Sequence, residues 1–193
     1  LQQTQVATVI GYYDRFLAAF PDVHALAGAH LDQVLGLWSG LGYYSRARNL
    51  HACARQVVDT FGGQFPREVA QLQTLKGIGP STAAAIASLC FEQRVAILDG
   101  NVKRVLTRHQ GFGLDLSVQA NEKKLQALAD QYLPRSASDM PAYTQGIMDL
   151  GATLCRRSSP ACTQCPVRHD CVANAAGNPQ DYPVKTKKTK RSA

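Results

Sequence analysis

The stretch Leu75-Lys76-Gly77-Ile78-Gly79-Pro80-Ser81-Thr82-Ala83 decides how the rest of the chain is interpreted. Two glycines flank one isoleucine, and the residues that follow favour a helix. Glycine tolerates positive φ, and because it has no Cβ it lets another backbone come close. The first turn of a helix offers unpaired N–H groups and a positive dipole end. The combination suits a phosphate, although an ordinary turn between two helices would show the same Gly-Ile-Gly.

A second stretch, Ile97-Leu98-Asp99-Gly100-Asn101-Val102-Lys103-Arg104, places one carboxylate among basic side chains. An Asp-Gly-Asn sequence is typical of a turn that caps a helix, and this is one interpretation of Asp99. The other is a catalytic carboxylate next to a clamp on a nucleic-acid backbone.

Composition favours a polyanionic partner. The chain has 193 residues, a net charge of +7 and 45% hydrophobic residues, and its pI is about 9.2. A basic chain of this kind is typical of nucleic-acid-binding proteins, among others. No apolar run reaches the roughly 18 residues of a membrane span, and no signal peptide is recognised, so we expect no membrane partner.

Apolar residues recur at helical spacing along most of the chain, and no alternating strand pattern persists. We therefore predict an all-α fold. Helices are expected at 3–20, 31–38, 47–61, 66–72, 81–90, 101–109, 118–132 and 141–153, with 95–98 as a buried connector. The Pro-, Lys- and Thr-rich end has no apolar period and is predicted to be a disordered tail or linker.

Four of the six cysteines cluster as Cys155-x6-Cys162-x2-Cys165-x5-Cys171. Four thiolates fit either a [4Fe–4S] cluster or zinc. Zinc sites usually combine two short Cys-x2–4-Cys pairs. Here only Cys162 and Cys165 have that spacing, and the longer x6 and x5 segments would enclose a larger metal centre. The arginines around the cysteines would either bind phosphate or neutralise the thiolates.

The segment Gly40-Leu41-Gly42-Tyr43-Tyr44-Ser45-Arg46-Ala47-Arg48 combines a glycine turn, two aromatic residues and two arginines. Tyrosines on such a loop can stack on bases or wedge between them. The alternative is a pair of core tyrosines with solvated arginines, which we favour for Tyr44.

These motifs together resemble the helix-hairpin-helix DNA glycosylases, with their hairpin, their essential aspartate and the cysteine loop of endonuclease III. The start of the chain, Leu1-Gln2-Gln3-Thr4-Gln5, narrows the resemblance to the adenine DNA glycosylase (MutY) family, over about residues 1–171. The resemblance implies a two-lobed helix-hairpin-helix DNA glycosylase fold with a [4Fe–4S] cluster loop. The expected bounds are 1–94 for the hairpin lobe, 95–175 for the cluster lobe and 176–193 for the tail.

The resemblance also assigns roles to residues. Asp99 would stabilise or capture the sugar cation, and Asn101 would hold the sugar or phosphate close by. Tyr43 matches the tyrosine that intercalates beside oxidised guanine, and Gln2 and Gln3 match the glutamines that fill the vacated stack. The remaining DNA-binding candidates are Lys76, Gly77, Gly79, Ser81 and Lys103. The metal ligands would be Cys155, Cys162, Cys165 and Cys171.

Ser81 stands where bifunctional relatives carry a lysine that forms a Schiff base, and a serine cannot form that imine. The resemblance therefore implies a monofunctional enzyme that flips out and removes adenine opposite 8-oxoguanine or guanine. It would act as a monomer in the cytoplasm, at the nucleoid if bacterial. An endonuclease III-like pyrimidine glycosylase and a catalytically impaired DNA-binding module are the alternatives.

One feature departs from the family. Its general-acid glutamate lies just upstream of the Leu-Gln-Gln-Thr-Gln motif, and the chain begins at Leu1. The expectation is that this glutamate and the C-terminal domain that reads 8-oxoguanine are absent, and that the chain alone releases adenine poorly.

Overall fold

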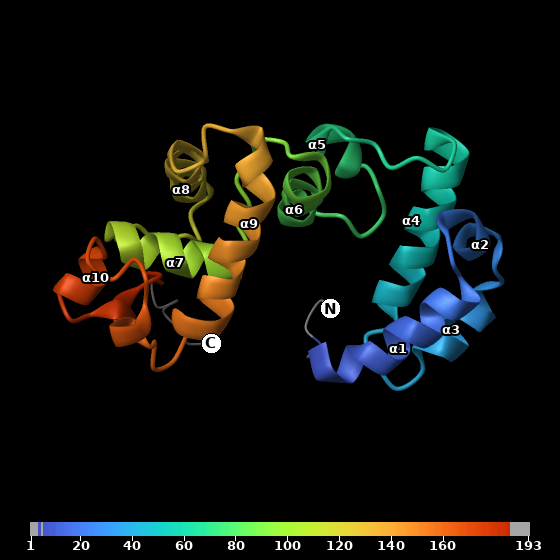
Figure 1. Ribbon diagram of the computed structural model, residues 1–193, viewed down its shortest axis with the longest axis horizontal. Helices are drawn as coiled ribbons and strands as arrows, with labels where there is room; N and C mark the ends of the chain where they lie inside the picture. Colours follow the sequence, from blue (N-terminus) through green and yellow to red (C-terminus); the bar gives the residue numbers. More distant parts are fainter. Residues whose placement is uncertain (1–3, 5, 186–193) are drawn as a thin grey trace, which may run out of the picture. The chain divides into compact units, whose positions relative to one another are not determined.

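The computed structural model describes Thr4 and residues 6–185, and every regular element in that part of the chain is a helix. The predicted all-α class is therefore confirmed. The longer helices, labelled in Figure 1, are α1 (Val6–Ala19), α3 (Leu31–Trp38), α4 (Ser45–Phe61), α6 (Pro80–Phe91), α7 (Gly100–Gln110), α8 (Gln119–Gln131) and α9 (Met140–Asp149). The shorter ones are α2 (Val23–Gly28), α5 (Val69–Leu72) and α10 (Val172–Ala175), with short 3-10 or π turns between them. No helix among the described residues is long and apolar enough to cross a membrane.

The chain divides into two compact units, Leu1–Ala83 and Ala84–Ala193. The division falls inside α6, whereas the sequence placed it after that helix, at residue 94. Helix α6 is apolar along most of its length, so its periodicity does not mark where one unit ends and the next begins.

The first unit has a core between α1, α2, α3 and α4. Its buried members are Phe20, Leu26, Val34, Ala47 and Ala54. Helix α2 was not predicted, because its six residues are too short for a periodic pattern. It begins where the Asp22 side chain accepts a hydrogen bond of 2.8 Å from the Ala25 N–H, which is the bond that an N-cap aspartate supplies.

The second unit has a core formed by the connector and helices α7 and α8. Its buried members are Ala96, Ile97, Leu98, Val102, Leu106, Leu125 and Ala129. The prediction that 95–98 is a buried connector is confirmed, since Ala96–Leu98 are buried and belong to no helix. Helix α7 then begins at a capped aspartate and ends at Gly111, whose φ is +62°.

Two predictions for the second unit differ from the structure. The expected helix 141–153 is α9, followed by a π-helical turn, η2 (Leu150–Leu154), that leads directly into Cys155. The tail expected to be disordered from residue 176 begins with a 3-10 turn, η4 (Pro179–Asp181), which hydrogen bonds hold against the rest of the unit. Residues 186–193 lie outside the described part of the chain.

Candidate functional site

The hairpin 75–79 is held in place from α4. The Gln56 amide nitrogen donates to the Thr74 carbonyl at 3.0 Å, and its oxygen accepts from the Lys76 N–H at 3.1 Å. Gly77 has a φ of +81°, and a Cβ there would lie 2.9 Å from Cβ of Asn49. A residue with a side chain would therefore be both strained and obstructed at this position.

The outer side of the hairpin is open. Lys76 and Gly79 are exposed, and a Cβ on Gly79 would meet nothing within 4 Å. Ser81 is half-buried in the first turn of α6, where backbone N–H groups lack intrahelical partners. The hairpin thus presents an exposed glycine and a helix start, which is the geometry that a backbone phosphate requires.

The loop before α4 presents an exposed tyrosine on a strained backbone. Gly40, Gly42 and Tyr43 all have positive φ, and the Tyr43 side chain is 64% exposed with a φ of 49°. The Arg46 guanidinium lies 5.5 Å from the Tyr43 ring centre and 5.4 Å from that of Trp38. Positive φ at a non-glycine residue costs of order 1–3 kcal/mol and is concentrated at functional sites.

Tyr44, which we expected in the core, is 40% exposed instead. It occupies the N-cap position of α4, at the end of the turn, and this placement keeps its ring at the surface. Gln2 and Gln3 lie outside the described residues.

Asp99 is the N-cap of α7. Its carboxylate accepts a hydrogen bond of 2.7 Å from the Val102 N–H, so the helix-cap interpretation of Asp-Gly-Asn is confirmed. Asp99 is half-buried and also lines an open pocket, here called the Asp99 pocket. The pocket walls come from the start of α7, residues 115–117, Arg157 with Ser158, and the segment that follows α10. The Asp99 carboxylate can therefore cap α7 and also face a molecule bound in the pocket.

Asn101 is tied to a neighbouring arginine. Its side-chain oxygen accepts a 2.9 Å hydrogen bond from Nη2 of Arg104, which also donates to the Gly151 carbonyl at 2.6 Å. Nε of Arg104 donates to the Cys155 carbonyl at 2.7 Å. Burial lowers the pKa of Arg104, and the neighbouring Cys155 thiol opposes that shift. Arg104 therefore connects Asn101, in the wall of the Asp99 pocket, to the first cysteine.

Lys103 forms an ion pair with Glu122 of α8 and is only half-exposed. We predicted from the sequence that Lys103 contacts DNA. The ion pair with Glu122 leaves its charge less available for a phosphate. The pairing could not be predicted from local spacing, because Glu122 lies nineteen positions from Lys103 in the sequence.

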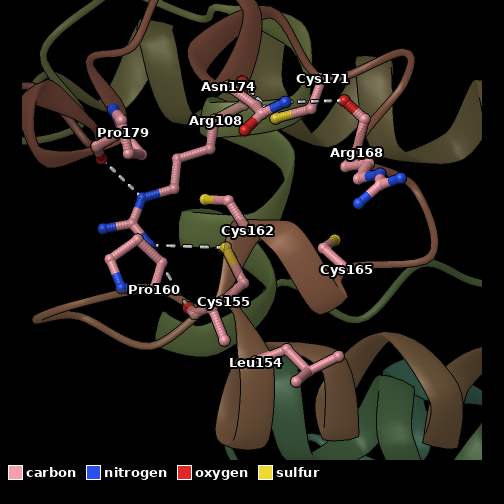
Figure 2. Close-up of a pocket in the computed structure, with 11 residues that line it drawn as sticks. Arg108, Leu154, Cys155, Pro160, Cys162, Cys165, Arg168, Cys171, Asn174 and Pro179 are labelled. Atoms are coloured by element: carbon pink, nitrogen blue, oxygen red, sulfur yellow. Dashed lines mark hydrogen bonds between the residues drawn. The ribbon is translucent and has the colours of Figure 1, made fainter.

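The four clustered cysteines line one pocket, and their side chains surround it in Figure 2. Cys155 follows η2, Cys162 begins the 3-10 turn η3 (Cys162–Gln164), Cys165 ends that turn, and Cys171 precedes α10. Burial raises the pKa of the Cys162 thiol, and the other three thiols raise it further. Burial also raises the pKa of Cys165. Within the described part of the chain, no three metal-ligating side chains converge enough to hold a single ion.

Arg108 organises this loop from α7, and sequence reasoning treated it only as part of the basic surroundings. Its side chain is 2% exposed and donates to the Pro179 carbonyl at 2.7 Å and the Arg156 carbonyl at 2.7 Å. Nη1 also donates to the Cys155 sulfur at 3.4 Å, and a dashed line marks this contact in Figure 2. The available signal was the i, i+4 spacing of Arg104 and Arg108 on an amphipathic helix, which places both on one face.

The helices have the arrangement of solved helix-hairpin-helix DNA glycosylases. A thermostable thymine-DNA glycosylase superposes with a TM-score of 0.80 at 26% identity, over 91% of this chain and 80% of that one. An endonuclease III bound non-covalently to DNA superposes with a TM-score of 0.70 at 24% identity, over the same shares, and at that identity it shows the fold alone.

The family model described as "HhH-GPD superfamily base excision DNA repair protein" matches residues 1–133, and the chain belongs to that family. The adenine DNA glycosylase of Buchnera aphidicola (subsp. Acyrthosiphon pisum) is 41% identical over 98% of this chain and 54% of its own length. The human adenine DNA glycosylase is 47% identical over 90% of this chain and 32% of its own length. The chain thus spans about half or less of the length of these relatives.

Proposed function

We propose that the chain carries the base-removing chemistry of an adenine DNA glycosylase acting on adenine opposite 8-oxoguanine or guanine. The observation that carries the proposal is the placement of Asp99, whose carboxylate is fixed by its cap bond at the wall of an open pocket. The identity of 41% and 47% to proteins named adenine DNA glycosylases supports the choice of base.

The chemistry requires two groups of opposite character. When the bond between the sugar carbon and the adenine nitrogen breaks, the electron pair leaves with the base and the sugar acquires oxocarbenium character. Asp99 stabilises that cation or captures it, and water then completes the hydrolysis. A general acid must protonate the adenine so that it leaves as a neutral molecule. That acid is the glutamate expected upstream of Leu1.

Ser81 fits a hydrolase without strand-cleaving activity. It is half-buried in the first turn of α6 and provides no amine. Lys76 lies on the other side of the hairpin and is exposed, which suits a phosphate contact better than an imine. The expected product is an intact strand with an abasic site.

The cysteine pocket fits a [4Fe–4S] cluster better than zinc. Structural zinc sites usually pair two short Cys-x2–4-Cys knuckles, whereas here only Cys162 and Cys165 have that spacing. A four-iron cluster is larger and is held by four separate thiolates, which agrees with four cysteines spread around one pocket. Cys155, Cys162, Cys165 and Cys171 would hold the cluster, which when bound supplies a fixed structure for this loop.

Duplex DNA is the proposed partner, bound by the protein as a monomer. The hairpin glycines and Lys76 would contact a backbone phosphate, and Tyr43 would stack beside the base opposite the adenine. Gln2 and Gln3 keep their proposed role in the vacated stack. The proposed location is the cytoplasm, at the nucleoid if the protein is bacterial.

The test is single-turnover release of adenine from a duplex containing an adenine–8-oxoguanine pair. The chain is compared with a version lengthened ahead of Leu1 by a segment that carries the expected glutamate, and with the same version carrying glutamine there. We expect rapid release only with glutamate, because positioned acid catalysis contributes roughly 10²–10⁴-fold. Equal rates in all three would mean that the acid lies within the 193 residues. Efficient borohydride trapping at a lysine would instead indicate endonuclease III-like chemistry.

A further inference from the structure

The first unit contains an apolar cavity to which α1, α2, α3 and α4 all contribute lining side chains; these helices are labelled in Figure 1. The cavity has a volume of about 470 Å³. The aromatic members of its described lining are Tyr12, Tyr13, Phe16, Phe20, Trp38 and Phe65. Small-molecule sites typically have volumes of roughly 300–1,000 Å³ and a lining of apolar and aromatic side chains.

The cavity combines an exposed apolar rim with a buried interior. Tyr13, Leu17 and Phe65 line it and remain exposed, whereas Phe20 and Cys53 are buried. Burial raises the pKa of the Cys53 thiol, so this group stays neutral. An apolar molecule that enters the cavity would remove both its own surface and this rim from water, which is favourable.

The charged groups of the lining do not favour a charged ligand. Among the described lining residues, only Asp22 and Arg46 carry charge, and their signs are opposite. The Asp22 carboxylate accepts a 2.8 Å hydrogen bond from the Ala25 N–H. Arg46 donates to the Thr4 hydroxyl at 2.9 Å and to the Leu41 carbonyl at 3.3 Å. Both side chains already have partners, so the cavity suits a neutral molecule.

One wall of the cavity holds the loop that presents Tyr43. Nε1 of Trp38 donates to the Gly42 carbonyl at 3.1 Å, and the Leu41 N–H donates to the Trp38 carbonyl at 3.1 Å. The Arg46 guanidinium lies against the rings of both Trp38 and Tyr43. A molecule packed against Trp38 would therefore also stabilise this loop.

We propose that the cavity is a binding site for a neutral, planar aromatic molecule, and that the bound molecule stabilises the loop that presents Tyr43. Aromatic rings attract one another in stacked or edge-to-face arrangements. Phe16 already packs edge-to-face against Phe20 and Trp38, with ring centres 4.9 Å and 6.2 Å apart. The inference goes beyond the proposed function, because it assigns the chain a ligand other than DNA and does not depend on base removal.

The first test uses Trp38 as the reporter, because it is the single tryptophan of the chain and lines the cavity. Energy transfer from Trp38 to N-phenyl-1-naphthylamine, a neutral aromatic probe, is followed as the probe is titrated. L17E should weaken probe binding roughly tenfold, because it removes apolar contact and brings a charge to the rim. Leu17→Gln replaces it if that variant does not fold.

The matched control is I10E, which makes the same kind of change on the same helix. Ile10 is exposed in α1 but is not among the residues that line the cavity. The I10E chain should therefore bind the probe as tightly as the unaltered chain. Absence of energy transfer in the unaltered chain, or equal probe affinity in the two variants, would overturn the proposal.

The second test measures hydrogen exchange at the Leu41 amide, which reports opening of the loop. N-phenyl-1-naphthylamine should slow this exchange in the unaltered chain, and less so in L17E. The control is the Ile78 amide of the hairpin, which donates to the Leu75 carbonyl at 3.1 Å and should not respond. Unchanged exchange at Leu41 would overturn the effect on the loop. A dimer that L17E dissociates in sedimentation would mean that a second copy of the chain covers the cavity, and would overturn the proposal as a whole.

Discussion

Nη1 of Arg108 lies 3.4 Å from the sulfur of Cys155, inside a helix-to-loop contact that also involves the carbonyls of Arg156, Arg157 and Pro179. One buried guanidinium thus fixes the start of the cysteine loop and the segment that leaves it. Arginine suits this role because its planar guanidinium carries five N–H donors in a fixed geometry. The ammonium group of lysine cannot bind the same set of carbonyls.

We expect Arg108→Met to destabilise the second unit and to impair filling of the cysteine pocket. Several backbone carbonyls would lose charge-assisted hydrogen bonds, each worth about 1.5–3 kcal/mol. Arg108→Lys should recover only part of the loss. Thermal unfolding and iron content measure both effects. Arg156→Met is the control, because Arg156 is exposed and donates only a 3.3 Å bond to Ser159. Equal stability of the two methionine variants would contradict the role of Arg108.

The two hairpin glycines should respond differently to substitution. Gly77→Ala places a Cβ against Asn49 at a φ of +81°, so we expect a loss of about 1–3 kcal/mol in unfolding free energy. Gly79→Val adds its side chain to open space, so the fold should persist while duplex affinity falls for all sequences alike. Unfolding and salt-dependent binding curves separate the two outcomes. Undiminished binding by a folded Gly79→Val chain would remove the hairpin from the interface.

Much of this fold was predictable from the sequence, because periodicity, glycine turns and cysteine spacing are local signals. Helix α3 was predicted with the bounds that the structure shows, and the buried connector after α6 was recognised by its apolar run. Long-range pairings were not predictable. Glu122 pairs with Lys103, and Arg104 binds the Gly151 carbonyl, only because α7 packs against α8 and η2. No local spacing reports such contacts.

Tyr43 offers a way to separate stability from binding. Tyr43→Gly removes the ring and also relieves the positive φ of 49°, so we expect unchanged or slightly higher stability. Stacking of an aromatic ring on a base is worth about 1–3 kcal/mol, so affinity for a mispaired duplex should fall roughly 5- to 150-fold. Thermal unfolding and equilibrium binding are the measurements. A parallel loss of stability would mean that Tyr43 serves the fold.

The cysteine pocket should contain iron. Anaerobically prepared protein is expected to be brown, with about four irons per chain. Cys162→Ser should lower the iron content, whereas Cys90→Ser should not, since Cys90 is exposed and lies in α6, outside the clustered set. Colourless protein with stoichiometric zinc would contradict the cluster assignment and identify the loop as a zinc site.

Asp99 has two roles that one pair of substitutions can separate. Asparagine is as good an N-cap as aspartate, so Asp99→Asn should keep the bond to the Val102 N–H and leave stability nearly unchanged. Asp99→Ala loses the cap, at a cost of about 1 kcal/mol. For a chain of this size that corresponds to a fall of about 2–4 °C in Tm. Both variants lose the negative charge that faces the developing sugar cation.

Single-turnover adenine release should therefore fall in both Asp99 variants by on the order of 10²-fold or more, the usual effect of removing one electrostatic stabiliser from a transition state. The measurement is made in the version that carries the upstream glutamate, so that acid catalysis is held constant. Duplex affinity should change little, because the carboxylate acts only after the base begins to leave. If Asp99→Asn releases adenine as fast as the unaltered protein while Asp99→Ala merely unfolds earlier, then Asp99 is a helix cap without a chemical role, and the pocket must take its stabilising charge from another residue.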